Sequence, residues 1–297
     1  MSASRVDVMV PCYDAADTVR LALASLHAQS FEDWRCLLVD DGSTDETHAL
    51  LTRAAAADPR FEVHRFERNR GRGAARQFLL ERVTAPLVAF LDADDWMYPD
   101  RLTDQVAWLQ LEPSLAAVGS PMAIFDDALE MVGEARPRVA SPLPAILEFP
   151  RPEPPRFFFP ASMLRSDIVK QAGFDERLRR SQDSDMLIRA LLGRRYALTA
   201  RPLYAYRRAA MTLDKTLEGY RYRMMAHRKH LRRHPLHVGR TLAQTYAKGA
   251  VLRAMAAVGA DEAVFDARYA APSSEAEAAY GAARETVTRA QERLWRG

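Results

Sequence analysis

The sequence has few cysteines and no long apolar run. Only two of its 297 residues are cysteines, Cys12 and Cys36, and both fall in segments that we predict to be strands or strand ends. Two such cysteines do not make a disulfide framework, and a reducing compartment suits them. No apolar stretch is long enough to span a bilayer, and no charged-then-apolar leader opens the sequence. We therefore expect a cytoplasmic protein.

The net charge is also small, at +3, but it is unevenly distributed. Basic residues gather in the second half, above all in "YRYRMMAHRKHLRRH" at residues 220–234. Two interpretations of this segment stay open: peripheral contact with the inner face of an anionic membrane, or a solvated helix that covers the rest of the fold. We expect no nucleic-acid partner, because no recognised binding module accompanies the charge.

The first hundred residues alternate between strand and helix patterns. We predict strands at residues 6–12, 35–41, 61–67 and 87–92, and helices at 18–29, 43–57 and 73–83. Ser43, followed by Glu46 three residues later, forms a capping-box pattern at the start of the second helix. Strands and helices that alternate at this spacing predict an α/β fold with right-handed crossovers and a mostly parallel sheet.

The rest of the chain has a different composition. Residues 136–160 are rich in proline and predict a long loop or lid, because proline lacks a backbone donor and fixes φ. Residues after 212 are rich in alanine and arginine and predict helices. We therefore divide the chain into a domain over residues 1–210, with halves 1–118 and 119–210, and a helical C-terminal extension over residues 211–297.

Carboxylates follow two of the predicted strands directly. Asp40 and Asp41 come after the second strand, and Asp92, Asp94 and Asp95 come after the fourth. Because parallel strands end at one crevice, both clusters should face the same cleft. Close carboxylates repel one another unless they are neutralised, and a hard cation such as Mg²⁺ or Mn²⁺ would neutralise them and bring phosphates with it. The alternative is that these acids are helix caps and turn formers.

Four motifs along the chain resemble, in order, those of the inverting GT-A glycosyltransferases of family 2. They are "VPCYDAADTVRLALASLHAQSFEDWRCLLVDDGSTDET", "NRGRGAARQ", "FLDADDWMYPDRL" and "FDERLRRSQDSDMLIRAL", and they cover roughly residues 5–207. The resemblance implies a GT-A fold, which is a Rossmann-like α/β/α sandwich. It also implies transfer of a sugar from a nucleotide-sugar donor, usually UDP-linked, to an acceptor hydroxyl with inversion. The acceptor would be a glycan, a lipid-linked sugar or another hydroxyl compound.

The resemblance also assigns residues to the nucleotide. The family's first loop, here Pro11, Cys12 and Tyr13, lies against the base. Asp41 contacts the base, and Asp40 supports the site.

In the second and third motifs, Asn69 and Arg76 stand where the family pattern has an Asn and an Arg near the donor. Asp92, Ala93 and Asp94 match the family's DxD motif: Asp92 faces the ribose or the metal, and Asp94 coordinates the metal that bridges the diphosphate. The implied cofactor is a divalent metal, Mn²⁺ or Mg²⁺.

The fourth motif supplies the catalytic base. Inversion requires a carboxylate that takes the acceptor's proton as the new bond forms. Asp183 occupies this position, although Gln182 precedes it where the family more often has Glu. Asp185 has two open interpretations, a functional acid or an acid favoured by the helix dipole.

The chain departs from the family pattern at Ala209, where a His is frequent. Either Arg207 or Arg208 replaces that His electrostatically, or both are solvated residues at a strand end. Other aromatic residues allow both a cleft and a core position; they are Trp96, Phe157, Phe158 and Phe159. His227 and His230 have helical spacing but no acidic neighbour in the sequence, so we predict them to be surface residues.

Two other functions are compatible with parts of the pattern. A nucleotidyltransferase also uses strand-end acids and a metal, but it needs a basic, glycine-rich loop after the first strand, where this chain has "PCYDAAD". A non-catalytic nucleotide-binding or scaffold protein that kept the fold also stays open, because the frequent His is absent.

Overall fold

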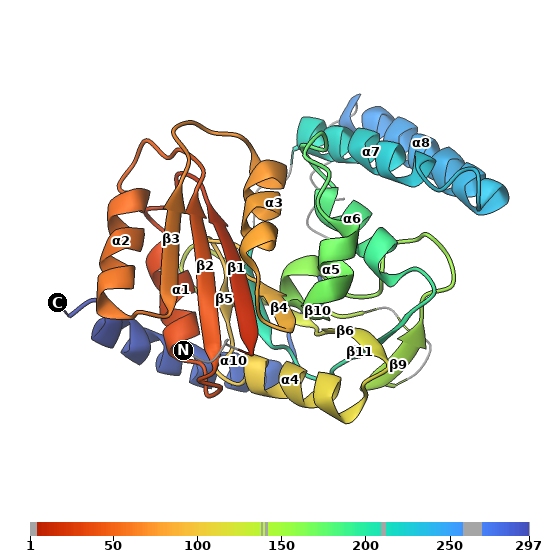
Figure 1. Ribbon diagram of the computed structural model, residues 1–297. Coiled ribbons are helices and arrows are strands. Elements are labelled where there is room, and N and C mark those ends of the chain that lie inside the picture. Colours follow the sequence, from red (N-terminus) through yellow and green to blue (C-terminus); the bar gives the residue numbers. More distant parts are fainter. Residues whose placement is uncertain (1–4, 138, 140–141, 209–211, 258–268, 297) are drawn as a thin grey trace.

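The computed structural model describes residues 5–137, 139, 142–208, 212–257 and 269–296 (Figure 1). Its largest sheet has eight strands in the order β3-β2-β1-β4-β10-β6-β11-β9. Their bounds are β1 Val6–Cys12, β2 Trp34–Asp40, β3 Phe61–Arg65, β4 Leu87–Phe90, β6 Leu115–Gly119, β9 Ala145–Glu148, β10 Ser162–Arg165 and β11 Arg195–Leu198. The four strands predicted in the first hundred residues all exist, and they pair in parallel.

The sheet as a whole is mixed. Strand β10 pairs antiparallel with both β4 and β6, and β9 pairs antiparallel with β11 at the far edge. The loop predicted over residues 136–160 is therefore wrong at β9. The four residues of β9 contain no proline, and an edge strand tolerates prolines just outside it.

A second sheet of four strands, in the order β5-β12-β7-β8, lies beside the first. Its strands are β5 Trp96–Met97, β7 Met122–Phe125, β8 Met131–Ala135 and β12 Tyr204–Arg207. Strand β12 pairs with β5, which follows the predicted acid cluster after β4. The late strand β12 is therefore adjacent to the acids of the first half of the chain.

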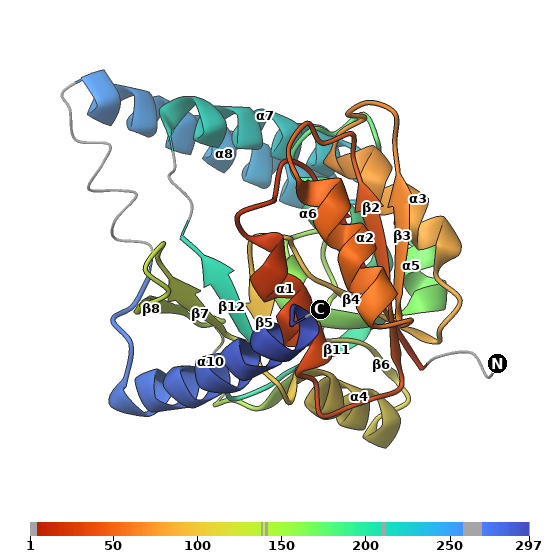
Figure 2. The same cartoon turned by 90° about the vertical axis from the view of Figure 1, so that its left-hand side faces the viewer.

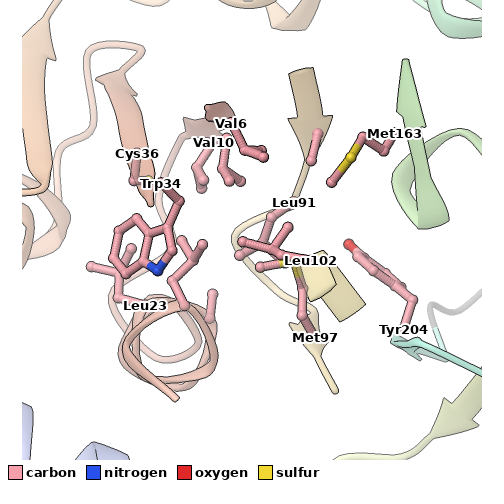
Figure 3. Packing of buried hydrophobic residues seen from close by; sticks show 14 of the residues in the cluster. Val6, Val10, Leu23, Trp34, Cys36, Leu91, Met97, Leu102, Met163 and Tyr204 are labelled. Carbon is pink, nitrogen blue, oxygen red and sulfur yellow. The ribbon is translucent and has the colours of Figure 1, made fainter. Parts of the chain in front are cut away.

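Helices cover both faces of the large sheet. They are α1 Val19–His27, α2 Thr47–Ala57, α3 Arg72–Arg82, α4 Arg101–Leu111, α5 Ser166–Ala172 and α6 Gln182–Leu191, with a short 3-10 turn at Phe159–Ala161. Side chains of a strand alternate between faces, so Val8 and Val10 of β1 pack in one cluster with α1, whereas Met9 packs in another with α3. Figure 3 shows the first cluster, in which Leu23 of α1 lies near Trp34 of β2.

The capping box predicted at Ser43 is wrong. Helix α2 begins at Thr47, and its cap residue, Glu46, makes no side-chain cap hydrogen bond. The Ser43 hydroxyl accepts the backbone N–H of Asp14 instead, at 2.9 Å. This hydrogen bond joins the loop after β1 to the loop after β2, at the end of the sheet where the predicted acids lie.

The chain after β12 folds as helices, as predicted, but they occupy two places. Helices α7 (Leu213–Arg228) and α8 (Pro235–Ala257) form a hairpin next to α6. Helix α10 (Ser274–Leu294) packs along α1. Figures 1 and 2 show α10 on the side of the molecule opposite the hairpin. The division at residue 211 stays a prediction.

Of the helices in the described ranges, none combines the length and the hydropathy that a membrane-spanning segment requires. The two cysteines are free and buried, in agreement with the expectation that they form no disulfide.

Candidate active site

A cleft of about 730 Å³ opens where the carboxyl ends of β1, β2 and β4 meet the first turns of α3 and α6. Most residues that the sequence assigned to a site line this cleft; they are Pro11, Cys12, Tyr13, Asp41, Asn69, Asp92, Ala93, Asp94 and Asp183. Asp40 and Arg76 do not line it. Acids from both predicted clusters thus face one cleft, as expected. Asp41 comes from the cluster after β2, and Asp92 and Asp94 come from the cluster after β4.

Two loops that meet at the cleft are joined by hydrogen bonds. The carboxylate of Asp14, after β1, accepts the backbone N–H of Thr44 at 2.9 Å. The backbone N–H of Ala15 donates to the hydroxyl of Thr47 at 2.7 Å. These contacts hold Tyr13 at the wall of the cleft with about half of its surface exposed. The ring therefore offers an aromatic face to a ligand.

Asp40 and Asp41 hold different loops. Asp40 is fully buried; its carboxylate accepts the Ser43 N–H at 2.9 Å and pairs with Arg65 at 3.2 Å. The carboxylate of Asp41 accepts the backbone N–H groups of Arg70 and Gly71 at 2.7 and 2.9 Å. Burial raises the pKa of Asp41, and these two hydrogen bonds oppose the rise. Asp41 thus fixes the loop that carries Asn69 into the cleft.

The turn after β4 is held from beneath by β12. The Tyr204 hydroxyl donates to the buried carboxylate of Asp95 at 2.7 Å and accepts the Asp92 N–H at 3.1 Å. Asp95 also accepts the Arg207 N–H at 2.8 Å. Burial, together with the charges of Asp94 and Asp92, raises the pKa of Asp95 well above its usual range. Asp95 therefore anchors β12; the helix-cap interpretation is wrong, because α4 begins only at Arg101.

Arginines compensate part of the negative charge. Arg76 is almost fully buried, donates to Asp92 at 2.8 Å and stacks over the ring of Phe159. Arg72, at the first position of α3, lines the cleft. The charge of Asp92 does most to raise the pKa of Arg72, and the charges of Asp94 and Asp183 add to this effect. The guanidinium of Arg72 therefore interacts both with the DxD pair and with Asp183.

Asp94 and Asp183 lie at the cleft on different elements. Burial and the charge of Asp92 raise the pKa of Asp94. Asp183 lies in the first turn of α6, which follows Ser181 in a left-handed conformation with φ of 59°. Its carboxylate accepts the Ser184 N–H at 2.7 Å.

Asp92 and Asp94 suit a hard divalent cation by chemistry, because both offer carboxylate oxygens and the two charges repel. Within the described ranges no group of three or more His, Cys, Asp or Glu side chains is placed to hold a metal by itself. Six carboxylates and four arginines line the cleft, so its formal charge favours a cation. The two aspartates fit a metal whose remaining ligands come from a bound molecule.

Several other predictions are settled by burial. Trp96 is fully buried and packs against Tyr98 and Tyr280, so it belongs to the core. Phe157 and Phe159 are also buried, whereas Phe158 is partly exposed, and none of the three lines the cleft.

The predictions for the acid and histidine side chains near α6 can also be decided. Asp185 is fully buried and pairs with Arg189 and with Lys229, so its role is to hold helices together. The surface prediction for His227 is wrong: it has no exposed surface, because α7 turns this side chain toward α6 and α8. His230 is partly buried.

The departure at residue 209 is only partly described. Ala209 lies outside the described residues. Arg207 lines the cleft, donates to the backbone oxygen of Asp94 at 3.2 Å and pairs with Asp127 at 2.8 Å. Arg208 is exposed and does not line the cleft. Of the two arginines, Arg207 is the one placed to act on a ligand.

Sequence reasoning missed four charged residues that line the cleft: Asp14, Arg179, Arg180 and Glu218. Arg179 and Arg180 lie in the same motif as Asp183, a few residues before it, so their proximity was a usable signal. Glu218 arrives from α7, where it pairs with Arg180. No local pattern predicts that contact, because it depends on how the hairpin docks.

Comparisons with known proteins agree with this arrangement. The model of the family described as "Glycosyl transferase family 2" matches residues 7–172. The succinoglycan biosynthesis proteins ExoU and ExoO of Rhizobium meliloti (strain 1021) are 30% and 32% identical to the chain over 206 and 212 residues. These alignments cover 65% and 68% of this chain, and the chain spans only 59% and 60% of the relatives' lengths.

Solved structures have the same fold at low identity. TarS 1-349 of S. aureus in complex with UDP-GlcNAc has a TM-score of 0.61 at 19% identity, over 76% of this chain and 66% of that one. The mannosyltransferase PcManGT from Pyrobaculum calidifontis, in complex with GDP-Man and Mn²⁺, has a TM-score of 0.58 at 19% identity. That match covers 99% of this chain and 88% of PcManGT.

The mixed sheet, with its cleft at the carboxyl ends of the strands, defines an α/β protein of the GT-A fold, as the resemblance implied. The family match covers more than half of the sequence, and the chain belongs to glycosyl transferase family 2.

Proposed function

We propose that the protein is a metal-dependent, inverting glycosyltransferase that moves a sugar from a nucleotide-sugar donor, with UDP preferred, to an acceptor hydroxyl. The observation that carries this proposal is the convergence on one cleft of Asp41 after β2, the pair Asp92 and Asp94 after β4, and Asp183 of α6. The relatives ExoU and ExoO are named for succinoglycan biosynthesis, which supports a polysaccharide or another glycan as the acceptor.

The donor would lie along the carboxyl ends of β1, β2 and β4. The base would meet Tyr13 and the loop that Asp41 and Asn69 stabilise, while the diphosphate would lie toward Asp92, Asp94 and Arg72. The complexes of TarS with UDP and with UDP-GlcNAc support a uridine donor. Because PcManGT was solved in complex with GDP-Man, a guanosine donor is the alternative that should be tested beside the uridine donor.

Asp92 and Asp94 would hold the divalent cation. When bound, Mn²⁺ or Mg²⁺ would neutralise the charge that grows on the diphosphate as it leaves the sugar. The buried Arg76 keeps Asp92 oriented through its 2.8 Å hydrogen bond. Arg72 and Arg207 place two further positive charges at the cleft, where they would oppose the same negative charge.

Asp183 would take the proton. It lines the same cleft as the DxD pair but comes from α6, and in this proposal the acceptor hydroxyl would meet the donor sugar there, on the face opposite the diphosphate. As the oxygen of the acceptor attacks, its proton passes to the carboxylate and the bond from sugar to diphosphate breaks. The neighbouring Gln182 also lines the cleft, and its buried Oε1 has no hydrogen-bond partner among the described residues.

The first experiment is a thermal-shift screen of UDP, GDP, dTDP and CMP, each with Mn²⁺ and with EDTA. A ligand that binds only the folded state raises the melting temperature by mass action. We expect the largest shift with UDP and Mn²⁺, and its loss in EDTA and in Asp94→Asn. Asp167→Asn is the matched control, because Asp167 is an exposed aspartate at a helix N-terminus outside the cleft.

Turnover tests the chemistry separately. We expect Asp183→Asn to keep the nucleotide-dependent shift but to lose transfer by at least about a hundredfold. Proton NMR of the product should show the anomeric configuration inverted relative to the donor. Normal transfer by Asp183→Asn, or a retained configuration, would contradict the mechanism. If all four nucleotides leave the melting temperature unchanged, the scaffold alternative gains support.

A further inference from the structure

The α7–α8 hairpin exposes an unusual number of large apolar side chains. Nine such side chains are exposed in the described part of the chain, and five of them lie in this hairpin: Met225, Leu231, Leu236, Tyr246 and Val251. Leu236 has 89% of its surface exposed, more than any of the others. Isolated exposed apolar residues are ordinary, but a concentration of them in one motif marks an interaction surface.

Two of these side chains, Leu236 and Val251, share one face of α8 with small residues. The opposite side of the helix packs on α7 through a narrow buried stripe of Val238, Thr245, Gly249 and Leu252. On the exposed side, alanines three or four residues apart continue the line from Leu236; they are Ala243, Ala247, Ala250 and Ala254. Val251 lies four residues after Ala247, so it joins the same face.

The hairpin is strongly basic beyond the start of α7, where its two acids, Asp214 and Glu218, lie. Residues 219–257 contain nine arginines and lysines and no aspartate or glutamate. Two of the nine are engaged: Lys229 pairs with Asp175 and Asp185, and Arg223 stacks on Tyr220. The others have no ion-pair partner within the described ranges; they are Arg221, Arg228, Arg232, Arg233, Arg240, Lys248 and Arg253.

We propose that the exposed face of the α7–α8 hairpin binds the surface of an anionic lipid bilayer. Apolar side chains on one face and flanking arginines and lysines are what an interfacial helix needs to enter the headgroup region of a membrane. A second copy of the chain would bring two acid-free, positively charged surfaces together, and their charges would repel. Nucleic acid would leave Leu236 and Val251 exposed to water or phosphate.

The hairpin that carries this surface is joined by ion pairs to the part of the fold that forms the cleft. Lys229, at the end of α7, bridges Asp175 and Asp185 of the catalytic half, at 2.8 and 2.7 Å. Glu218 of α7 lines the cleft itself. A bilayer bound to α8 would therefore hold the cleft close to its surface, where a lipid-linked acceptor is available; this last step rests on the proposed function, whereas the binding does not.

Vesicle flotation with the full chain tests the proposal. Vesicles of phosphatidylcholine mixed with phosphatidylglycerol are compared with vesicles of phosphatidylcholine alone, at low and at high salt. We expect binding to the anionic vesicles that is at least about tenfold stronger and that high salt weakens. The double variant Leu236→Glu/Val251→Glu should lose most of this binding. Leu111→Glu is the matched control, since Leu111 is 76% exposed but lies on α4.

Circular dichroism and thermal melting check that each variant is folded. If the double variant fails to fold, Arg232→Gln/Arg233→Gln/Arg240→Gln takes its place, with the same loss expected. Equal binding to both kinds of vesicle, no binding, or unchanged binding by a folded variant of the hairpin overturns the proposal. A second result would also overturn the proposal. In it, the wild-type chain does not bind vesicles but forms an oligomer in sedimentation velocity, and the double variant is a monomer. A negative vesicle result alongside a positive nucleotide shift would leave the proposed activity intact.

Discussion

Residues that never touch the cleft decide its geometry. Asp95, Tyr204 and Arg101 are all buried below the turn that carries Asp92 and Asp94. Arg101 donates to the backbone oxygen of Phe90 at 3.0 Å and lies over the Tyr204 ring, and burial lowers its pKa to about 10. An arginine with this pKa keeps its charge at neutral pH. A buried polar network therefore lies beneath the DxD turn.

Tyr204→Phe should weaken this network without opening a cavity. It removes the hydroxyl that donates to Asp95 and accepts from the Asp92 N–H, so two buried polar groups lose a partner. We expect a loss of about 1–3 kcal/mol in the free energy of unfolding, measured by urea denaturation. Tyr246→Phe, at an exposed tyrosine of α8, is the control and should change little. Equal stability of the two variants would contradict this role of Tyr204.

Gly42→Ala should disturb the loop that presents Asn69. Gly42 has a φ of 73°, and a Cβ there would lie 2.5 Å from the backbone carbon of Arg68 and 2.6 Å from the backbone nitrogen of Asn69. We expect a loss of at least about 1 kcal/mol in stability and a smaller nucleotide-dependent thermal shift. In Gly239→Ala the new Cβ meets nothing within 4 Å, so that variant should keep both. A normal nucleotide shift in Gly42→Ala would show that the loop tolerates displacement.

At the scale of elements, the sequence predicted those helices and strands whose positions depend on the local residue pattern. Strand β1 has the predicted bounds because a short, mostly apolar run is typical of a strand buried on both faces, and all of its residues except Pro11 are buried. The predicted start of α2 was wrong because the Ser43 hydroxyl accepts a hydrogen bond from Asp14, in the loop after β1, and does not cap the helix. The insertion of β10 between β4 and β6 has no local signal either, since a strand's neighbours depend on the whole topology.

The same contrast applies to the site. The aspartates that end β2 and β4 could be predicted because a strand end fixes where the next residues lie. The burial of His227 and the arrival of Glu218 at the cleft could not, because both depend on how α7 packs against α6.

His227 should make the docking of the hairpin sensitive to acid. Its Nδ1 lies 2.9 Å from the Arg223 backbone oxygen, and burial lowers its pKa. The charges of Arg223 and His237 lower it further, whereas Asp185 on α6 opposes them. Because the folded-state pKa is below the unfolded value of about 6.5, the unfolded chain binds the proton first. Stability is therefore complete above about pH 6.5 and falls as the pH decreases from there.

Urea denaturation between pH 7.5 and 5 measures this effect by comparing the wild-type chain with His227→Gln. Glutamine cannot take up a proton, so the variant should lose less stability over this range than the wild-type chain. His64→Gln is the control, because His64 is on β3 and partly exposed. A pH dependence that is the same in all three proteins would show that other groups cause the acid sensitivity.

At the scale of the whole molecule, the end of the chain supports its beginning. Helix α10 packs on α1, and Tyr280 and Val287 of α10 join a buried cluster with Trp96, the residue that follows the DxD turn. The Tyr280 hydroxyl donates to the Leu129 backbone oxygen at 2.9 Å. The two parts of the C-terminal segment, the α7–α8 hairpin and α10, thus have different structural roles. The hairpin lies beside the cleft, whereas α10 completes the core below the second sheet.

Tyr280→Ala should therefore destabilise the fold although Tyr280 does not line the cleft. The side chain is 97% buried, and its ring contacts Trp96 with centroids 5.1 Å apart. Removing it leaves a cavity, for which we expect a loss of about 3–5 kcal/mol in the free energy of unfolding by urea. Tyr280→Phe removes only the hydroxyl and should lose about 1 kcal/mol. If Tyr280→Ala melts like the wild-type chain, α10 is an appendage rather than part of the core, and the division at residue 211 would gain support.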